Sequence, residues 1–324
     1  MSERVAIRTD RLTRAYGPQL AVNEISFEVP RGQVLGFLGP NGAGKSTTMK
    51  MLTCYLTPTR GSAQVAGFDV YSQSLEVRRR IGYLPEDTPL YRDMTVLEYL
   101  DFVTRLRKVP AGERRARIKK IGETTGILHV LGKQISELSR GYRQRVGLTQ
   151  AIVHDPEILV LDEPTSGLDP NQIVEIRSLI KELGREKTVI LSTHILPEVQ
   201  ATCDRVVIIS DGRLAADGRP DELIAREKSN RFRILLDAGP VEAEVRAKLA
   251  TIAGVTGVEA QPGDADTRAF LLTTDGAADI RRELFRAAVD NAWPLLELER
   301  REASLEEVFG RLTRVDAAGT KEAA

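Results

Sequence analysis

The stretch QVLGFLGPNGAGKSTTM, from Gln33 to Met49, decides the fold of this 324-residue chain. Its apolar run from Val34 to Leu38 suits a buried strand, and a glycine-containing loop follows before Lys45, Ser46 and Thr47 open a helix. This is the G-x-x-x-x-G-K-[ST] spacing of a phosphate-binding P-loop, in the strand, loop and helix context that such a loop requires. The sequence therefore predicts a nucleoside triphosphate site, although a P-loop alone does not indicate which class of NTPase carries it.

The residue types of this loop suit the binding of a triphosphate. Glycines let several backbone N–H groups point at a phosphate, and the start of the following helix adds a partial positive charge. Lys45 can reach the β- and γ-phosphates, and the Ser46 hydroxyl can ligate Mg²⁺. The loop residues expected to bind nucleotide are Gly39, Pro40, Asn41, Gly42, Ala43, Gly44, Lys45, Ser46 and Thr47.

A second buried strand ends in two carboxylates. The continuous apolar run from Ile158 to Leu161 is typical of a strand covered on both faces, and Asp162 and Glu163 follow it directly. Open α/β sheets bind ligands at this end of their strands, and burying two acids for packing alone would be costly. We expect Asp162 to hold Mg²⁺ and Glu163 to orient or deprotonate the attacking water. His194 comes just past the end of the next expected strand, Thr188 to Ser192.

Two further helix starts carry polar caps. Ser139 precedes a helical stretch, where serine is a good N-cap, and Gly141 leaves the N–H groups of that helix start open to an anion. Asp169 followed by Pro170 is an N-cap followed by proline at the first helical position.

Composition limits the class of protein. Hydrophobic content of 42% and charged content of 28% are ordinary for a globular protein, and 46 basic residues balance 46 acidic ones. No broad nucleic-acid footprint is therefore expected. Two distant cysteines, Cys54 and Cys203, indicate a reducing, cytoplasmic setting. The N-terminus lacks the apolar core of a secretory signal, and no run approaches the ~18 apolar residues of a membrane helix, so another chain would have to supply any membrane span.

One expected helix, Glu113 to Ile121, is strongly basic. Its side chains form either a solvated face or a surface attracted to an anionic membrane or partner. The basic residues are Arg114, Arg115, Arg117, Lys119 and Lys120.

The pattern of predicted secondary structure changes near residues 225–230. From Arg231 onward, two strand–helix–strand units predict a small α+β domain of the ferredoxin-like kind, without a catalytic constellation and suited to regulation or docking. We therefore expect an ATP-binding domain at 1–228 with a helical subdomain at about 87–155, an accessory domain at 229–315, and a disordered tail at 316–324.

Six motifs in a fixed order carry a family resemblance. They are Tyr16, GPNGAGKST from Gly39 to Thr47, LSRGYRQ from Leu138 to Gln144, ILVLDEP from Ile158 to Pro164, SGLDP from Ser166 to Pro170, and STH from Ser192 to His194. This set resembles the ATP-binding subunit of an ABC transporter, over roughly Val5 to Ala225. The resemblance implies an α/β P-loop NTPase fold with an antiparallel β subdomain and a helical subdomain.

The resemblance also implies a sandwich dimer that shares two ATP molecules. Ser139 and Gly141 would cap the γ-phosphate bound to the other protomer, and Asp169 would communicate across the dimer. Glu163 would be the catalytic base and His194 would contact the γ-phosphate. Tyr16 would stack on adenine, although its position alone also suits a tyrosine that merely packs on a strand.

The sequence departs from the family pattern in two places. The signature LSGGQ becomes LSRGYRQ, with Arg140 replacing the first glycine and Tyr142 the glutamine, while the serine and second glycine remain. Glu86, in IGYLPE, stands where the family carries a glutamine that touches Mg²⁺. Glu86 is therefore either a ligand of Mg²⁺ or a solvated loop acid.

The resemblance implies an ATPase motor that drives a separate transmembrane permease from the cytoplasmic face of the membrane. The run after Glu86 and the C-terminal extension are similar to the exporter-type branch, which includes gliding-motility-associated subunits. The helices up to about Gln134 would dock on the permease, and one complete motif set favours a homodimer. A soluble ABC-type ATPase acting on ribosomes or nucleic acid is the alternative, but it usually needs two cassettes or a coiled-coil insertion. Glu163 and His194 argue against a clamp that binds without hydrolysis.

Overall fold

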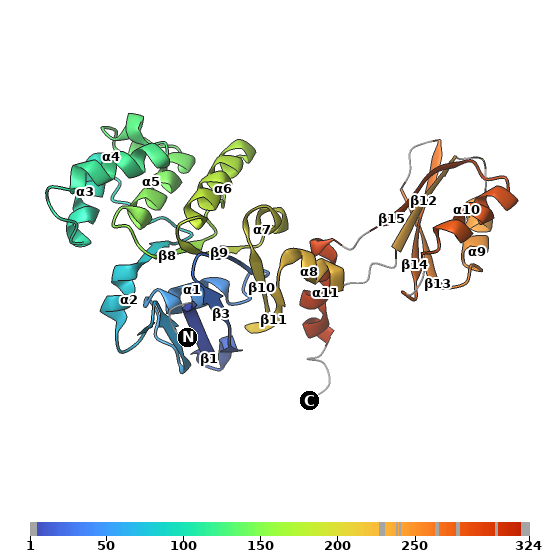
Figure 1. Ribbon diagram of the computed structural model, residues 1–324, viewed down its shortest axis with the longest axis horizontal. Coiled ribbons are helices and arrows are strands. Elements are labelled where there is room, and N and C mark those ends of the chain that lie inside the picture. The colour runs from blue at the N-terminus through green and yellow to red at the C-terminus, as the bar shows by residue number, and fades with distance from the viewer. Residues whose placement is uncertain are drawn as a thin grey trace. The chain divides into compact units, whose positions relative to one another are not determined.

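The computed structural model describes residues 5–226, 231–237, 239, 241–262, 266–276, 279–301 and 304–318 (Figure 1). They form two compact units, one within residues 1–220 and 309–324 and the other within residues 221–308.

A six-stranded sheet forms the centre of the first unit, in the order β11-β10-β4-β9-β8-β7. Neighbouring strands are parallel except for β10 and β11. Strands β4, β8 and β9 are buried along their whole length, as parallel strands covered on both faces should be. The bounds are β4 (Val34–Leu38), β7 (Ile81–Leu84), β8 (Ile158–Asp162), β9 (Thr188–Thr193), β10 (Arg205–Ser210) and β11 (Arg213–Gly218).

A second sheet of this unit is antiparallel, in the order β2-β1-β5-β6, with β3 also paired to β1. Its core is continuous with that of the central sheet, because the rings of Phe27 and Phe37 lie 5.6 Å apart. Met49 and Leu52 of helix α1 (Lys45–Leu52) pack into the same core. The strands are β1 (Val5–Tyr16), β2 (Gln19–Ile25), β3 (Glu28–Pro30), β5 (Arg60–Val65) and β6 (Phe68–Asp69).

Three helices, α3, α4 and α5, lie together at one end of this unit and share a core of their own (Figure 1). Val96, Leu100 and Val103 of α3 recur at helical spacing and are buried there, and Thr95 and Glu98 form a capping box at its start. The other helices of the unit are α2 (Ser74–Arg80), α3 (Val96–Leu106), α4 (Arg114–Thr124), α5 (Arg140–Ile152), α6 (Pro170–Gly184) and α7 (Leu196–Thr202), with 3₁₀ turns at Leu128–Val130 and Ile135–Glu137. These observations confirm the predicted P-loop fold with its antiparallel and helical parts.

The second unit is a four-stranded antiparallel sheet in the order β13-β14-β12-β15. With α9 after β12 and α10 after β14, this is the βαββαβ topology of a ferredoxin-like fold. Alternate residues Phe232, Ile234 and Leu236 of β12 are buried against both helices. The elements are α8 (Pro220–Arg226), β12 (Arg231–Asp237), α9 (Glu242–Leu249), β13 (Val255–Gln261), β14 (Thr267–Thr274), α10 (Arg281–Asp290) and β15 (Leu295–Arg301). Helix α11 (Leu305–Ala318) begins in this unit, and its residues from 309 onward are assigned to the first.

Two predicted boundaries meet the limits of the described residues. The junction expected at 228 and 229 falls within 227–230, which lie outside them, as do residues 319–324 of the expected tail. Residues 316–318 of that tail belong to α11.

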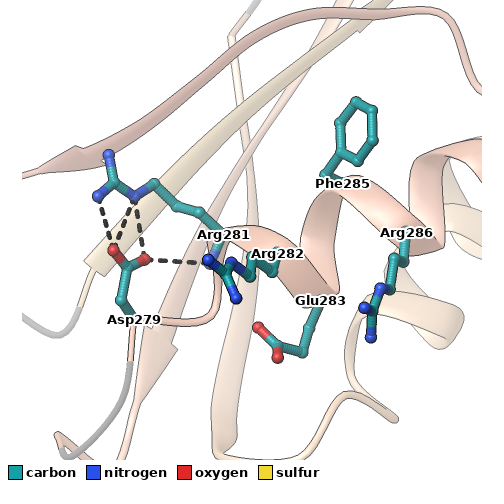
Figure 2. Close-up of a pocket in the computed structure, with 6 residues that line it drawn as sticks. All are labelled: Asp279, Arg281, Arg282, Glu283, Phe285 and Arg286. Carbon is teal, nitrogen blue, oxygen red and sulfur yellow. Dashed lines mark hydrogen bonds and ion pairs between the residues drawn. The ribbon is translucent and has the colours of Figure 1, made fainter.

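An open cavity of about 900 Å³ lies along α10 (Figure 2). Asp279 holds the Arg281 guanidinium through both carboxylate oxygens and also accepts from the Arg281 backbone N–H (Figure 2). Arg281 is also the main cause that lowers the pKa of Asp279 to about 2.

His154, just after α5, is a mostly buried titratable group away from the P-loop. Its Nε2 lies 3.1 Å from the carbonyl oxygen of Ile81, so Nε2–H donates to that oxygen. Burial, followed by the nearby charge of Arg107, lowers the pKa of His154 from 6.5 to about 4. The ring is therefore neutral in the folded protein near pH 7.

Acid should destabilise the fold through His154. Between pH 6.5 and about 4 the unfolded chain binds a proton that the folded one does not, so the free energy of unfolding falls as pH falls. The loss should total about 3 kcal/mol across this window, since one pKa unit corresponds to about 1.4 kcal/mol. His154→Gln keeps a donor for Ile81 and should lose less stability in urea titrations at successive pH values. Equal losses of stability at low pH in both proteins would contradict the attribution of this loss to His154.

Candidate functional site

The P-loop joins β4 to α1 in a conformation that two of its glycines make possible. Gly44 has a φ of +104°, and a Cβ there would lie 2.4 Å from the carbonyl oxygen of Ala21. A Cβ on Gly39 would lie 2.5 Å from the carbonyl oxygen of Ile209. Helix α1 begins without a side-chain cap or an acid in its first turn, so its first N–H groups face the loop as an anion site.

Lys45 is a buried cation at the start of α1. Its ammonium donates to the carbonyl oxygens of Gly39 and Pro40, at 2.8 and 3.2 Å. The same nitrogen lies 3.5 Å from Oε1 of Glu163, on the neighbouring part of the sheet edge. Lys45 therefore places one positive charge between the loop and the acid that follows β8.

Ser192 ties the two acids after β8 to the next strand. Its hydroxyl donates to Oδ1 of Asp162 at 2.5 Å and accepts from the backbone N–H of Glu163 at 3.0 Å. Ser46 of the P-loop donates to the same Asp162 oxygen at 3.1 Å. One carboxylate oxygen is thus shared by hydroxyls from β9 and α1.

Asp162 is 2% exposed, and its pKa is raised above the usual range. Burial is the main cause and the adjacent charge of Glu163 adds to it, while hydrogen bonds from Ser192 and Ser46 act in the opposite direction. The buried Asp162 carboxylate is therefore suited to bind a cation, because a positive charge would offset its desolvation.

Glu163 is held in an unusual backbone conformation. Its φ is +49°, in a region that costs a non-glycine residue about 1–3 kcal/mol and that clusters at functional sites. Oε2 lies 2.9 Å from Nδ1 of His194, and Oε1 faces the Lys45 ammonium. Because a carboxylate accepts, Nδ1–H donates and Nε2 of His194 remains for another partner. The conformation thus holds a buried carboxylate between an imidazole and an ammonium.

A cavity of about 460 Å³ brings these groups together. It is lined by Ala21, Asn41, Gly42, Gly44, Lys45, Ser46, Thr47, Glu86, Glu163, Ser166 and His194. Most of the predicted P-loop residues, the predicted base and Glu86 therefore share one cavity, while Asp162 lies behind Ser46.

Tyr16 lies apart from that lining, at the end of β1. Its side chain is 46% exposed, and the guanidinium of Arg14 lies 4.8 Å from the centre of its ring. The ring therefore has a free face for stacking, and its expected contact with adenine stays a prediction.

The signature residues lie at the start of α5, away from the cavity lining. The Ser139 hydroxyl accepts from the N–H of Tyr142 at 3.4 Å, as an N-cap does. The Asp169 carboxylate caps α6 in the same way, accepting from Gln172 at 3.0 Å. A Cβ on Gly141 would meet the Gln172 side chain at 2.5 Å, so the starts of α5 and α6 lie side by side.

Comparisons with known proteins place the chain in a family. The profile of the ABC transporter family matches residues 22–166. NatA, an ABC transporter ATP-binding protein of Bacillus subtilis, is 39% identical over 64% of this chain and 86% of its own length. The Nod factor export ATP-binding protein I of Burkholderia orbicola is 36% identical over 93% of this chain and 94% of its own.

A solved structure indicates the same family. That of cbiO1 from Clostridium perfringens, part of the ABC transporter complex cbiONQ, has a TM-score of 0.63 and 30% identity over 78% of this chain and 96% of that one. The chain belongs to the ABC transporter family.

As an ABC transporter ATP-binding protein, the chain is an ATPase. This confirms the family resemblance, and the alternative of an ATPase acting on ribosomes or nucleic acid has no support among these relatives. In the described part of the chain, no helix combines the length and apolar character needed to span a bilayer.

Sequence reasoning missed three residues of this ABC ATPase site. Ala21 enters the cavity from β2, in a different sheet, and no local pattern signals it. Ser166 follows the acid pair, and Ser192 stands in the STH stretch, but neither was assigned a contact. The available signal for Ser192 was the pair of polar residues just before His194, at the end of a strand otherwise rich in apolar side chains.

Removing the Ser192 hydroxyl should disturb both acids at once. Ser192→Ala deletes the donor to Asp162 and the side-chain acceptor of the Glu163 N–H, so the ATPase rate should fall about 10- to 100-fold, as when a group that positions reacting groups is lost. Nucleotide affinity should change little, because Ser192 is not among the residues that line the cavity. Steady-state ATPase and nucleotide-binding assays measure both.

The matched control is Ser178→Ala, which removes a hydroxyl bonded only to a backbone oxygen on the exposed side of α6. An equal loss of activity in both variants, or none in Ser192→Ala, would contradict the role of Ser192.

Proposed function

We propose that this chain hydrolyses ATP with Mg²⁺ to drive export through a separate membrane permease, with Glu163 as the catalytic base. The observation that carries this proposal is the buried Glu163 carboxylate held between Lys45 and His194 at the P-loop cavity. The family membership supports the ATPase, and the geometry supports the assignment of roles.

The cavity suits a nucleoside triphosphate. The N–H groups of the loop and of the first turn of α1 would donate to phosphate oxygens, and Lys45 would neutralise charge on the β- and γ-phosphates. Gly42 and Gly44 let the backbone approach closely, since both have positive φ values. Tyr16 would stack on the adenine ring with its exposed face.

Hydrolysis needs a base beside the γ-phosphate. Glu163 would accept a proton from water while the water oxygen bonds to the γ-phosphorus. The bond between that phosphorus and the bridging oxygen breaks, and the pair of electrons leaves with ADP. His194 donates to Glu163 through Nδ1, so it orients the carboxylate. With both ring nitrogens protonated, it would also donate Nε2–H to a γ-phosphate oxygen.

The chemistry of the oxygen donors fits Mg²⁺. The Ser46 hydroxyl and the buried Asp162 carboxylate share a hydrogen bond, and Glu86 lines the same cavity from another loop. Mg²⁺ prefers hydroxyl and carboxylate oxygens together with substrate phosphates. Ser46, Asp162 and Glu86 would hold the ion, which supplies positive charge that offsets the charge of the phosphates.

Two copies of the chain would complete each site. Ser139, Gly141 and Asp169 lie at paired helix starts that do not line the cavity of their own chain. A helix start offers N–H donors to an anion, so these residues would meet the γ-phosphate bound by a second copy. The relative cbiO1, which is part of an ABC transporter complex, and the Nod factor export relative support a permease-bound homodimer at the cytoplasmic face of the membrane, working as an exporter.

Glu163→Gln should separate binding from hydrolysis. The amide cannot take a proton from water, so the ATPase rate should fall by about 10² to 10⁴, the usual effect of losing a general base. ATP affinity should stay close to that of the unmodified protein. Glu175→Gln on the exposed face of α6 is the matched control, and a Glu163→Gln rate within tenfold of normal would assign the base elsewhere.

The same Glu163→Gln protein tests the permease. Held in the ATP-bound form, it should retain its partners when captured with ATP from detergent-solubilised host membranes, and mass spectrometry should show a multi-span membrane protein in stoichiometric amount. Ribosomal proteins without a membrane protein would instead contradict the transport function.

The Mg²⁺ concentration that ATP hydrolysis requires should depend on the side chain at position 86. If Glu86 is a ligand, Glu86→Gln keeps an oxygen but loses a charge, and Glu86→Ala loses both. The Mg²⁺ concentration for half-maximal ATPase should therefore rise a few-fold in the first variant and at least about tenfold in the second. Identical Mg²⁺ titrations in all three proteins would make Glu86 a solvated loop acid.

A further inference from the structure

The corner between α3 and α4 concentrates positive charge. The stretch RLRKVPAGERRARIKK, from Arg105 to Lys120, holds eight basic residues and one acidic residue in a chain whose total charge is balanced. The basic side chains are exposed or half-buried on the outside of the three-helix group. We call this stretch the α3–α4 basic surface.

Most of these charges lack an acidic partner. Arg105 pairs with Asp101 at 2.5 Å and Arg117 pairs with Glu113 at 3.0 Å. Within the described parts of the chain, the other six have no carboxylate within 4.0 Å, namely Arg107, Lys108, Arg114, Arg115, Lys119 and Lys120. The surface therefore carries a large uncompensated charge.

The stability of α4 does not explain where these charges lie. Arg114, Arg115 and Arg117 occupy its first turn, which has no acidic residue, and its last turn has no basic one. The helix dipole favours the opposite arrangement, by about 0.3–1 kcal/mol for each charge near a terminus. Arg117 pairs with the N-cap residue Glu113, but Arg114 and Arg115 have no such partner among the described residues, so their placement at this helix start is better explained by an external anion.

Neighbouring elements extend the positive field. The Arg107 guanidinium donates to the carbonyl oxygen of Arg78 on α2, at 2.6 Å. On the other side of the corner, Lys187 binds Asp155 and, with Arg117 and Lys120, helps to lower the pKa of that acid. Three acids beside the surface, Asp101, Glu113 and Asp155, are thus already paired with a basic side chain.

An exposed aliphatic side chain lies within this surface. Leu106, between Arg105 and Arg107, is 68% exposed, although it ends the amphipathic helix α3. Close by on the same helix, Phe102 is partly exposed, with the ring of Tyr91 5.6 Å away. Clustered basic side chains around an exposed apolar residue are the combination that binds the interface of an anionic bilayer.

We propose that the α3–α4 basic surface binds the anionic lipid headgroups of a membrane. The long arginine and lysine side chains reach headgroup phosphates from this corner, and Leu106 enters the apolar boundary beneath them. A nucleic acid is the less favoured anion. Leu106 would gain nothing from nucleic-acid phosphates, whereas it can enter the apolar boundary of a bilayer, and the relatives are transporter subunits. This interaction goes beyond the proposed ATPase function, since it needs neither ATP nor a permease. The permease contact expected of the helices up to about Gln134 would then be made by residues of these helices outside the α3–α4 basic surface.

Vesicle flotation of the purified full-length protein tests the proposal. The protein should bind vesicles of equal parts phosphatidylglycerol and phosphatidylcholine, and it should not bind vesicles of phosphatidylcholine alone. Salt of about 1 M, with a Debye length of about 3 Å, should release it. The triple variant Arg114→Gln, Arg115→Gln and Lys119→Gln should bind about a hundredfold more weakly, since each basic residue near an anionic surface is worth about fivefold.

The matched control removes three arginines from the second unit, Arg282→Gln, Arg286→Gln and Arg300→Gln, which changes the net charge equally (Figure 2). It should bind vesicles as the unmodified protein does, and thermal melts should show that both variants fold. Equal losses in both variants would assign the binding to net charge. Equal binding to both kinds of vesicle, or a short RNA duplex that binds more tightly than the vesicles and displaces them, would overturn the proposal.

Discussion

The site depends on the parallel pairing of β4, β9 and β8. Leu38 pairs with Thr193 and Asp162 pairs with Ser192, so the three strands end at one edge of the sheet. That register sets the P-loop, the acid pair and His194 beside each other, although the P-loop lies more than a hundred residues before the other two in the sequence. A slip by one residue would turn Asp162 away from Ser46, so the chemistry of the site requires this register.

Two buried acids at one strand end must be stabilised by their surroundings. Asp162 gains two hydroxyl donors, and Glu163 gains an imidazole and an ammonium. The left-handed backbone of Glu163 turns its carboxylate toward the cavity while Asp162 stays behind Ser46. Strain in one residue thus gives two adjacent carboxylates different environments, one suited to a metal ion and one to a proton.

Sequence reasoning succeeded where the determinants are local. The P-loop from Gly39 to Thr47 and the position of His194 after β9 follow from spacing, caps and apolar runs that act within a few residues. It could not find Ala21 or the role of Ser192, because these contacts join strands distant in sequence and depend on the sheet order. The charge pattern of α4 was visible in the sequence. That these charges lie unfavourably for the helix dipole became evident only from the start of that helix at Arg114 in the structure.

The altered signature shows how a departure from a family pattern can be accommodated. Arg140 replaces a small residue at the start of α5, and its guanidinium lies 2.2 Å from where a Cβ of Gly167 would stand. Gly167 also has a φ of +68°, so any larger residue there would be strained and would displace the arginine. The guanidinium therefore covers the loop that leads to Asp169, next to the contact between Gly141 and Gln172. Because these contacts lie within one chain, the starts of α5 and α6 are held as a single surface before any second copy meets them.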